Sequence, residues 1–369
     1  MESQPKSIFS SLSRWLTVGV GQILVSIIIP LIAFVVMWQG FIFLRDGDAP
    51  QLITVLIAII WGVGGIGVLY FLANWILDKF PDTIQTSLRP YAFVGPALVI
   101  LAWFLFIPTL RTLYASFFDA TTTNFVGLQN YIFAFTDTRM VESFRNNLIW
   151  LIVGTGLSVV FGTLVAVLAD RSKFEVAAKS LIFLPMAISF VGAGVIWRFM
   201  YAYKPEGVPQ IGLLNAIVVA FGGQPQAWLT ISPWNNLFMV AILIWLQTGY
   251  AMVLISAALK GVPEELLEAA RIDGANEIKI FFRILLPSIK QTIITVSTTI
   301  IILTLKIFDI VFVMTNGNFG TEVMASQQYK QMFRYQDFGR GSAVAIVLLI
   351  AVIPVMWYNL KQFGKREAF

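Results

Sequence analysis

Long runs of apolar residues recur along nearly the whole chain. Each run is about 20 residues long, the length at which an α-helix crosses a hydrocarbon layer of about 30 Å. A single run of this kind could be a helix buried in a large soluble core, but eight together favour an all-α membrane protein. The predicted transmembrane helices are residues 21–44, 52–77, 91–110, 147–169, 180–202, 237–259, 288–314 and 341–360.

The composition strengthens this prediction and removes several classes of function. The chain is 58% hydrophobic and 12% charged, so it has too little polar surface to cover a water-soluble fold. It contains no cysteine and no histidine, which excludes disulfides, thiolate or histidine metal sites and a Ser-His-Asp triad. The net charge of +5 is better explained by loop topology than by nucleic-acid binding, so we expect membrane lipid and not nucleic acid as a partner.

The distribution of basic residues predicts the orientation. Both terminal segments and the loops 78–90, 170–179 and 260–290 hold fifteen Lys and Arg residues, against eight in the opposite loops. Because cytoplasmic loops carry the excess of Lys and Arg, we expect both termini and the 260–290 loop in the cytoplasm, around a multi-pass protein of the inner (plasma) membrane.

The most polar interruption between the later apolar runs covers residues 264–287. Pro263 can precede a helix whose first turn carries Glu264 and Glu265, since negative charge is favourable at a helix N-terminus. Gly274 can end this helix in a left-handed conformation. The next residues repeat apolar positions at helical spacing, so the segment is predicted to form two short helices around a glycine corner.

Polar side chains within the predicted transmembrane helices mark candidate solute contacts, because burying them in lipid is costly. Lys306 and Asp309 are three residues apart and are expected on one helical face. Two interpretations stay open: a structural ion pair, or a wet cavity that binds hydroxyl groups. Gln247 and Tyr250 supply an amide and a hydroxyl, although such groups also join helices. The helix that contains Ser189 is expected to be kinked, because Pro185 precedes it.

Several motifs resemble carbohydrate-importer permeases of the ABC class. From about residue 91 onward, the chain contains FVGLQNY, SLIFLPMAISFVGAGVIWRFMY, GVPEELLEAARIDGAN and FDIVFVMTNG. The third includes E-A-A followed four residues later by glycine, and Ile284 with Leu286-Pro287 completes the EAA loop of these permeases. The resemblance implies the transmembrane fold of a type I ABC importer, with eight transmembrane helices and a cytoplasmic coupling helix. The implied ATPase-coupling residues are Glu264, Glu265, Glu268, Ala269, Ala270, Asp273, Gly274 and Ala275.

By the same resemblance, the sugar pathway lies at mid-membrane. Positions similar to sugar contacts of the maltose-type larger permease subunit fall near Met186, Phe190, Gln247, Thr304 and Lys306, and differ from it in residue type, so a different sugar is expected. The last third leans toward the α-glucoside branch and its glucosylglycerol relatives. Together with the polar groups noted above, the candidate substrate-pathway residues are Met186, Ser189, Phe190, Gln247, Tyr250, Thr304, Lys306 and Asp309.

The resemblance also implies an organisation and a set of partners. Residues 1–90 would be an extension with two transmembrane helices, and residues 91–369 a six-helix core with the permease domain at about 143–360. The partners would be a second similar permease, two cytoplasmic ATPase subunits, and a periplasmic or lipid-anchored binding protein. The chain has no G-x-x-x-x-G-K-[ST] motif, so we expect no cofactor and no enzyme activity in it, with ATP and Mg²⁺ bound by the ATPase partners.

Three other classes of function compete with this interpretation. An ion-coupled secondary transporter could use Lys306 and Asp309, but it predicts repeated halves, and no convincing repeat is present. An intramembrane enzyme would need a cluster of acidic residues near an interface, whereas the acids here are scattered or lie in the 260–290 loop. A scaffold subunit would not need polar groups at mid-membrane.

Overall fold

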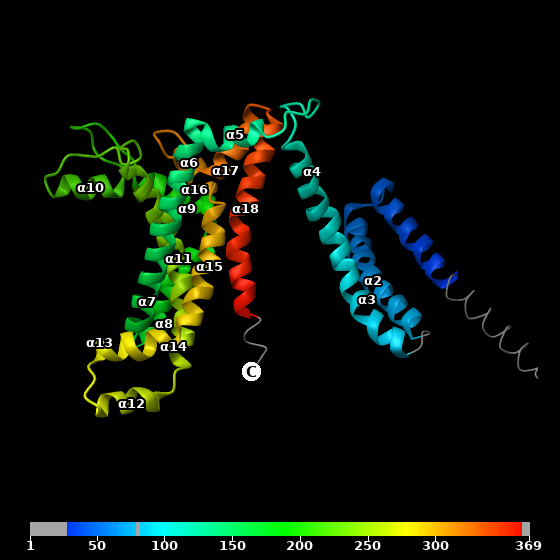
Figure 1. Cartoon of the computed structure of the whole chain (residues 1–369), viewed down its shortest axis with the longest axis horizontal. Coiled ribbons are helices and arrows are strands. Elements are labelled where there is room, and N and C mark those ends of the chain that lie inside the picture. The colour runs from blue at the N-terminus through cyan, green and yellow to red at the C-terminus, as the bar shows by residue number, and fades with distance from the viewer. Residues whose placement is uncertain (1–27, 79–81, 171, 364–369) are drawn as a thin grey trace, which may run out of the picture. The chain divides into compact units, whose positions relative to one another are not determined.

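The computed structural model describes residues 28–78, 82–170 and 172–363, and these residues are helical apart from their connecting turns. One isolated bridge joins Phe118 and Phe125. The chain divides into two compact units, Met1–Pro108 and Thr109–Phe369. The helices are shown in Figure 1.

The first unit contains the helix Ile28–Asp46, α2 (Gln51–Leu77), α3 (Asp82–Leu101) and the π-helical turn η1 (Ala102–Phe106). Residues 21–27 of the first predicted transmembrane helix lie outside the described residues. Few contacts hold these helices together: the Trp61 indole donates to the Met37 carbonyl at 2.9 Å, and Tyr70 stacks on Phe93. The apolar stretches of the three helices contain no buried residue, which is the pattern of helices surrounded by lipid.

The second unit is a bundle of transmembrane helices with short helices at both ends (Figure 1). Three transmembrane helices within it are continuous from end to end: the run α6–η2–α7, α11 and α18. The elements are α4 (Ile107–Ala115), α5 (Gln129–Thr136), α6 (Thr138–Ile149), η2 (Trp150–Thr155), α7 (Gly156–Asp170), α8 (Glu175–Phe183), η3 (Leu184–Ala187), α9 (Phe190–Met200), α10 (Leu213–Ala220), α11 (Trp234–Lys260), α12 (Glu264–Ile272), α13 (Glu277–Ile280), η4 (Phe281–Leu285), α14 (Leu286–Ser288), α15 (Lys290–Leu305), α16 (Asp309–Met314), α17 (Met324–Tyr329), η5 (Lys330–Arg334) and α18 (Phe338–Phe363).

Two of the predicted transmembrane helices are bent pairs. Residues Glu175–Ala187 and Phe190–Met200 meet at 103°, and Glu277–Ser288 and Lys290–Leu305 meet at 68°. Counted as one span each, these pairs and the six continuous helices of the described residues give eight, the number predicted. The expectation of one helix over 288–314 is wrong, because α15 ends at Leu305 and α16 turns away to pack on α9. Gly194 of α9 permits this contact, since a Cβ there would lie 3.1 Å from Val313.

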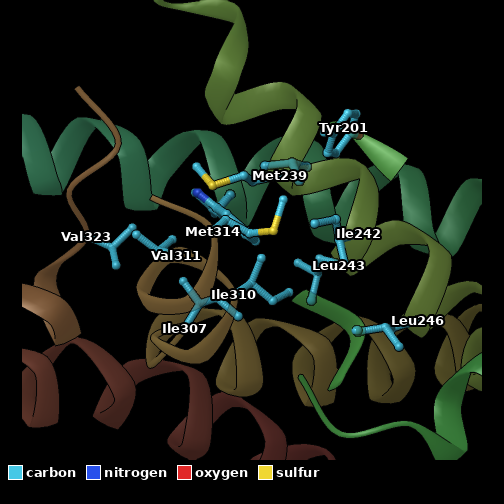
Figure 2. Packing of buried hydrophobic residues seen from close by; sticks show 13 residues of the cluster. Tyr201, Met239, Ile242, Leu243, Leu246, Ile307, Ile310, Val311, Met314 and Val323 are labelled. Carbon is cyan, nitrogen blue, oxygen red and sulfur yellow. The ribbon is translucent and has the colours of Figure 1, made fainter. Parts of the chain in front are cut away.

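The largest buried cluster lies where α9, α11 and α16 meet. Figure 2 shows Leu243 of α11 near Ile310 of α16, with Met239, Ile242, Ile307 and Met314 in the same cluster. These side chains are almost completely buried. Tertiary packing of this cluster therefore explains why the chain leaves the expected helix at residue 306.

Glycines let the helices approach closely. A Cβ on Gly162 of α7 would lie 2.4 Å from the Cβ of Ala251 and 2.9 Å from the Met252 nitrogen of α11. At Gly249 of α11, a Cβ would lie 2.5 Å from the Ile182 carbonyl oxygen of α8. Small residues at such crossings allow backbone-to-backbone packing in membranes. The second crossing positions the site described next.

Candidate functional site

A half-open cleft of about 350 Å³ lies beside the 103° bend. Its walls come from η3, the bend and the start of α9, the middle of α11, and α15. Five residues predicted for the substrate pathway line this cleft, and four further residues were not predicted. The lining residues are Met186, Ile188, Ser189, Phe190, Leu246, Gln247, Tyr250, Thr299 and Leu303.

The bend is built by local chain chemistry. Pro185 lies in the first turn of η3, where a missing N–H is tolerated. Ser189 then adopts an extended conformation and caps α9, because its Oγ accepts a hydrogen bond from the Gly192 nitrogen at 3.0 Å. Gly249 allows α8 to lie directly against α11. Together these features bring residues of two distant segments to one cleft.

The cleft combines apolar walls with neutral polar groups and has no charged lining residue. Gln247 is 6% exposed, and its carboxamide has no hydrogen-bond partner among the described residues. Because Gln247 lines the cleft, this unpaired carboxamide is available to donate to and accept from a ligand there. Tyr250 and Thr299 add hydroxyl groups. The arrangement suits a neutral molecule with hydroxyl groups and some apolar surface.

Three of the predicted pathway residues lie outside the cleft. Thr304 is fully buried, and its hydroxyl donates to the Ile300 carbonyl at 2.7 Å. Lys306 is exposed at the end of α15, and Asp309 begins α16. The expectation that Lys306 and Asp309 share one helical face is wrong, because the chain breaks between them. Neither forms an ion pair with the other, and contact of these three residues with substrate stays a prediction.

The unpredicted lining residues carry different amounts of sequence signal. Thr292, Thr295 and Thr299 are three and four residues apart, so they form a polar stripe along α15 that could have indicated Thr299. Ile188, Leu246 and Leu303 resemble any other apolar residue of a transmembrane helix. Their place in the cleft depends on the bend and on helix packing.

The predicted coupling segment forms two short helices around a glycine, as expected. Gly274 has φ +79°, and the Ala275 and Gly274 nitrogens donate to the Ala270 and Arg271 carbonyls, both at 3.0 Å. This is a Schellman ending, which requires the left-handed conformation that glycine adopts most easily. The Asn276 side chain then caps α13 by accepting from the Lys279 nitrogen at 2.9 Å.

The coupling segment presents apolar side chains to its surroundings. None of the residues of α12 is buried. Leu266 is 51% exposed, Ile272 86% and Ile278 69%. Most of the predicted coupling residues are also exposed: Glu264, Glu265, Glu268, Ala269, Asp273 and Gly274, with Ala270 and Ala275 half-buried. An exposed helix with this mixture of acidic and apolar residues is a candidate contact surface for another protein.

A polar network, here called the inner network, lies where α11 leads into α12. Lys179 of α8 donates to the carboxylates of Asp170 and Glu175, the latter at 2.6 Å, and to the Ser256 hydroxyl at 2.5 Å. Lys260 also pairs with Glu175, at 2.5 Å. The network therefore ties α7, α8 and α11 together, next to the coupling segment and at the start of the helix that leads to the cleft.

A second ion pair is buried at the opposite end of the unit. Lys330 Nζ lies 2.6 Å from Glu322 Oε2, and these side chains are only 9% and 6% exposed. Lys330 also donates to the Asn316 carbonyl at 2.9 Å, and the Ser326 hydroxyl bonds to Glu322. This pair was not predicted from the sequence.

Asparagines of α6 and α11 attach the surrounding loop to the bundle. Asn146 donates to the Gly320 carbonyl at 2.9 Å, and Asn236 donates to the same carbonyl at 3.0 Å. Asn147 accepts from the Met324 nitrogen at 2.9 Å. These bonds fix the loop between α16 and α17 to the end of the unit opposite α12. Among the described residues, no group of three or more acidic side chains is placed to hold a metal ion.

Solved structures with a similar fold are membrane subunits of transporters. A chain from the crystal structure of a bacterial alginate ABC transporter, in complex with an alginate pentasaccharide-bound periplasmic protein, aligns with a TM-score of 0.66 and 18% identity. The match covers 75% of this chain and 94% of that chain. This likeness confirms the predicted fold class, an all-α membrane fold shared with that transporter chain.

Sequence comparisons identify the family. Residues 158–360 match the family described as binding-protein-dependent transport system inner membrane component. The osmoprotective compounds uptake permease protein GgtC of Synechocystis sp. is 57% identical over 275 residues, which is 74% of this chain and 99% of that protein. The alpha-glucoside transport system permease protein AglF of Rhizobium meliloti is 48% identical over 332 residues, covering 86% and 98%. The chain therefore belongs to the family of binding-protein-dependent transport system inner membrane components and is a permease of the ABC importer class.

Proposed function

We propose that this permease imports a neutral glycoside, of the α-glucoside or glucosylglycerol type, through the cleft beside Gln247. The observation that carries the proposal is the Gln247 carboxamide, which lines a cleft without charged residues and has no protein partner among the described residues. A sugar would supply hydroxyl groups to this amide and to Tyr250 and Thr299. Its C–H faces would contact Phe190 and Met186.

The names of the two relatives support the substrate class. GgtC is an osmoprotectant uptake permease and AglF an α-glucoside permease, and both align over nearly their full length. A glucosylglycerol-like molecule combines a sugar ring with a small polyol and carries no charge. Such a ligand fits a cleft that has neutral donors and acceptors and a volume of about 350 Å³.

The energy for import would come from a partner. We propose that α12 binds a cytoplasmic ATPase subunit through Leu266, Ile272 and the acidic residues of its first turn. In the complete transporter, two ATPase subunits would serve this chain and a second, similar permease, and a binding protein would deliver the sugar. Closure of the ATPase pair would shift α12, and with it α11 and α15, so that the cleft changes the side on which it opens.

The proposed orientation places α12 in the cytoplasm. The exposed end of α18 lies at the same end of the unit as α12 in Figure 1. The positive-inside prediction for the 260–290 loop and for the C-terminal segment agrees with this common side. The N-terminal residues lie outside the described residues, and their cytoplasmic location is proposed from their basic residues alone.

The test is uptake by the complete transporter reconstituted in liposomes. Glucosylglycerol and an α-glucoside such as trehalose should be transported with ATP inside, and an acidic oligosaccharide should not. Gln247→Ala should raise the half-saturating sugar concentration about tenfold, the equivalent of one lost hydrogen bond of about 1.4 kcal/mol. Gln224→Ala changes an exposed glutamine of the outer loop and is the matched control.

Each result bears on a separate part of the proposal. Unchanged uptake kinetics in Gln247→Ala would show that the cleft does not bind the sugar. Uptake that proceeds without ATP but with an ion gradient would instead support secondary transport. Chemical cross-linking of a cysteine introduced at Ile272 tests the ATPase contact directly, since the chain has no native cysteine.

A further inference from the structure

The segment between α9 and α11, residues 201–233, is here called the excursion, and it has an unusually apolar surface. No Asp, Glu, Lys or Arg occurs between Glu206 and Lys260. The excursion contains α10, whose neighbourhood exposes large apolar side chains: Ile211 is 68% exposed, Leu213 51% and Phe221 88%. Loops that face water normally carry polar and charged residues, so this surface is too apolar for a loop that is surrounded by water.

The one polar side chain of α10, Asn215, is turned inward and satisfied. Asn215 is fully buried, and its amide donates to the Ala202 and Gln226 carbonyls, both at 3.0 Å. Its oxygen accepts from the Gln226 nitrogen at 2.8 Å and from the Trp228 indole at 3.1 Å. This side chain therefore closes the excursion into a fixed hairpin and leaves no polar group of α10 directed outward.

The backbone end of α10 is closed in the same way. Gly222 has φ +79°, its nitrogen donates to the Val219 carbonyl at 2.9 Å, and the Gly223 nitrogen donates to the Val218 carbonyl at 2.9 Å. These bonds satisfy carbonyls that would otherwise need water. A helix end whose carbonyls are satisfied internally can lie against hydrocarbon.

The direction of α10 fits a membrane surface. In Figure 1, α10 runs across the direction of α7 and α15, near the end of the unit opposite α12, and it contacts α9. Trp234 is 58% exposed and Tyr203 45% exposed at the two bases of the excursion. Exposed Trp and Tyr residues are typical of the boundary between lipid and water.

We propose that α10 lies in the outer leaflet of the membrane, with Leu213, Ile217 and Phe221 among the lipid acyl chains. Lipid is favoured over a protein partner because the outward face of α10 offers no charged or hydrogen-bonding side chain, whereas protein interfaces carry about one hydrogen bond per 100–200 Å² and a polar rim. The inner face, which in a free interfacial helix would be polar, packs on the protein through Leu214 and Asn215. This inference does not depend on the transported sugar, but its choice of the outer leaflet rests on the proposed cytoplasmic location of α12.

The test uses single cysteines in the otherwise cysteine-free chain, within the complete transporter whose partners have been freed of reactive cysteines. Phe221→Cys and Ile217→Cys are labelled with an environment-sensitive fluorophore, and Lys204→Cys, exposed in the same excursion, is the matched control. The transporter is placed in nanodiscs made with ordinary or with acyl-brominated phosphatidylcholine. Retained ATP-dependent uptake in liposomes shows that each labelled protein is folded.

We expect both α10 probes to lose about half of their emission in brominated lipid, because an interfacial helix lies about 5–10 Å below the headgroups. The Lys204 probe should keep its emission. Equal emission of the α10 probes in both lipids, or equal quenching at Lys204, would overturn the proposal. Emission that changes only when the binding protein is added would identify a protein contact and would overturn it too.

Discussion

The closest helix crossing beside the cleft gives a prediction of defined size. A Cβ on Gly249 would lie 2.5 Å from the Ile182 carbonyl oxygen and 2.8 Å from the Phe183 Cα, whereas ordinary contact begins at 3.4 Å. Both obstructing atoms are backbone, so no side chain can rotate away. Gly249→Ala must therefore move α8 away from α11 by about 1 Å. Overpacking of this kind costs about 1–3 kcal/mol.

The displacement also acts on the cleft, because α8 leads directly into η3, which carries Met186, while Gln247 lies two residues before Gly249. Separation of these two walls should weaken sugar contacts. We expect the half-saturating sugar concentration for uptake to rise about tenfold, the equivalent of about 1.4 kcal/mol. The assay is ATP-dependent uptake by the reconstituted transporter, together with the thermal unfolding midpoint in detergent.

Two other glycine substitutions separate loss of affinity from loss of stability. Gly162→Ala creates a similar overlap between α7 and α11, and α7 contributes no residue to the cleft, so this change should lower the unfolding midpoint and leave the half-saturating concentration unchanged. A Cβ on Gly156 would have no neighbour within 4 Å, and this residue lies in a helix, where alanine is favoured over glycine by about 0.5–1 kcal/mol. If Gly249→Ala destabilises the protein but leaves sugar affinity unchanged, the inference that this crossing sets the cleft geometry is refuted.

Three further substitutions test other parts of the structure. Gly274→Ala should strain the left-handed turn by about 1–2 kcal/mol and strongly reduce sugar-stimulated ATP hydrolysis. Gly274→Asn should retain most of this ATP hydrolysis, because asparagine tolerates the left-handed conformation. Equal activity of the two variants would argue against a conformational role of Gly274. Lys179→Gln removes the centre of the inner network and should lower the amount of sugar transported per ATP hydrolysed. Lys173→Gln, at an exposed position, should not change this ratio. A proportional loss of sugar transport and ATP hydrolysis in Lys179→Gln would indicate only a structural role. Lys330→Met leaves the Glu322 carboxylate buried without its cation and should cost about 3–5 kcal/mol of stability, measured as a lower unfolding midpoint. Adding Glu322→Gln should partly restore the midpoint. An unchanged midpoint in the single variant would contradict this.

Features that depend on neighbouring residues could be predicted from the sequence. The apolar runs indicated the transmembrane helices, and the glycine after an amphipathic segment indicated the left-handed corner at Gly274, because only local backbone sterics decide it. Five predicted pathway residues came together at the cleft, including Ser189 and Gln247. Pro185 marked the bend near which they meet.

Features that depend on tertiary packing could not be predicted in this way. The end of α15 at Leu305 has no proline or glycine to mark it, and it follows from the burial of Ile307 and Ile310 against α11. Lys306 and Asp309 therefore appeared to share a helix. The Glu322–Lys330 pair lies in a loop whose path is set by asparagines of distant helices, so spacing along the chain gave no signal for it.

The length of α2 links the first unit to the thickness of the bilayer. Its 27 residues make a helix about 40 Å long, about 10 Å longer than the hydrocarbon core of a typical membrane. By contrast, α11 of the cleft wall is equally long, but 56% of its apolar stretch is buried within the protein, where the 11-residue α9 packs against it. Lipids with shorter acyl chains should therefore force α2 to tilt further or to thicken the surrounding bilayer, while the cleft is largely shielded. The acyl-chain length of the membrane thus acts on the first unit, separately from the chemistry of the transported molecule.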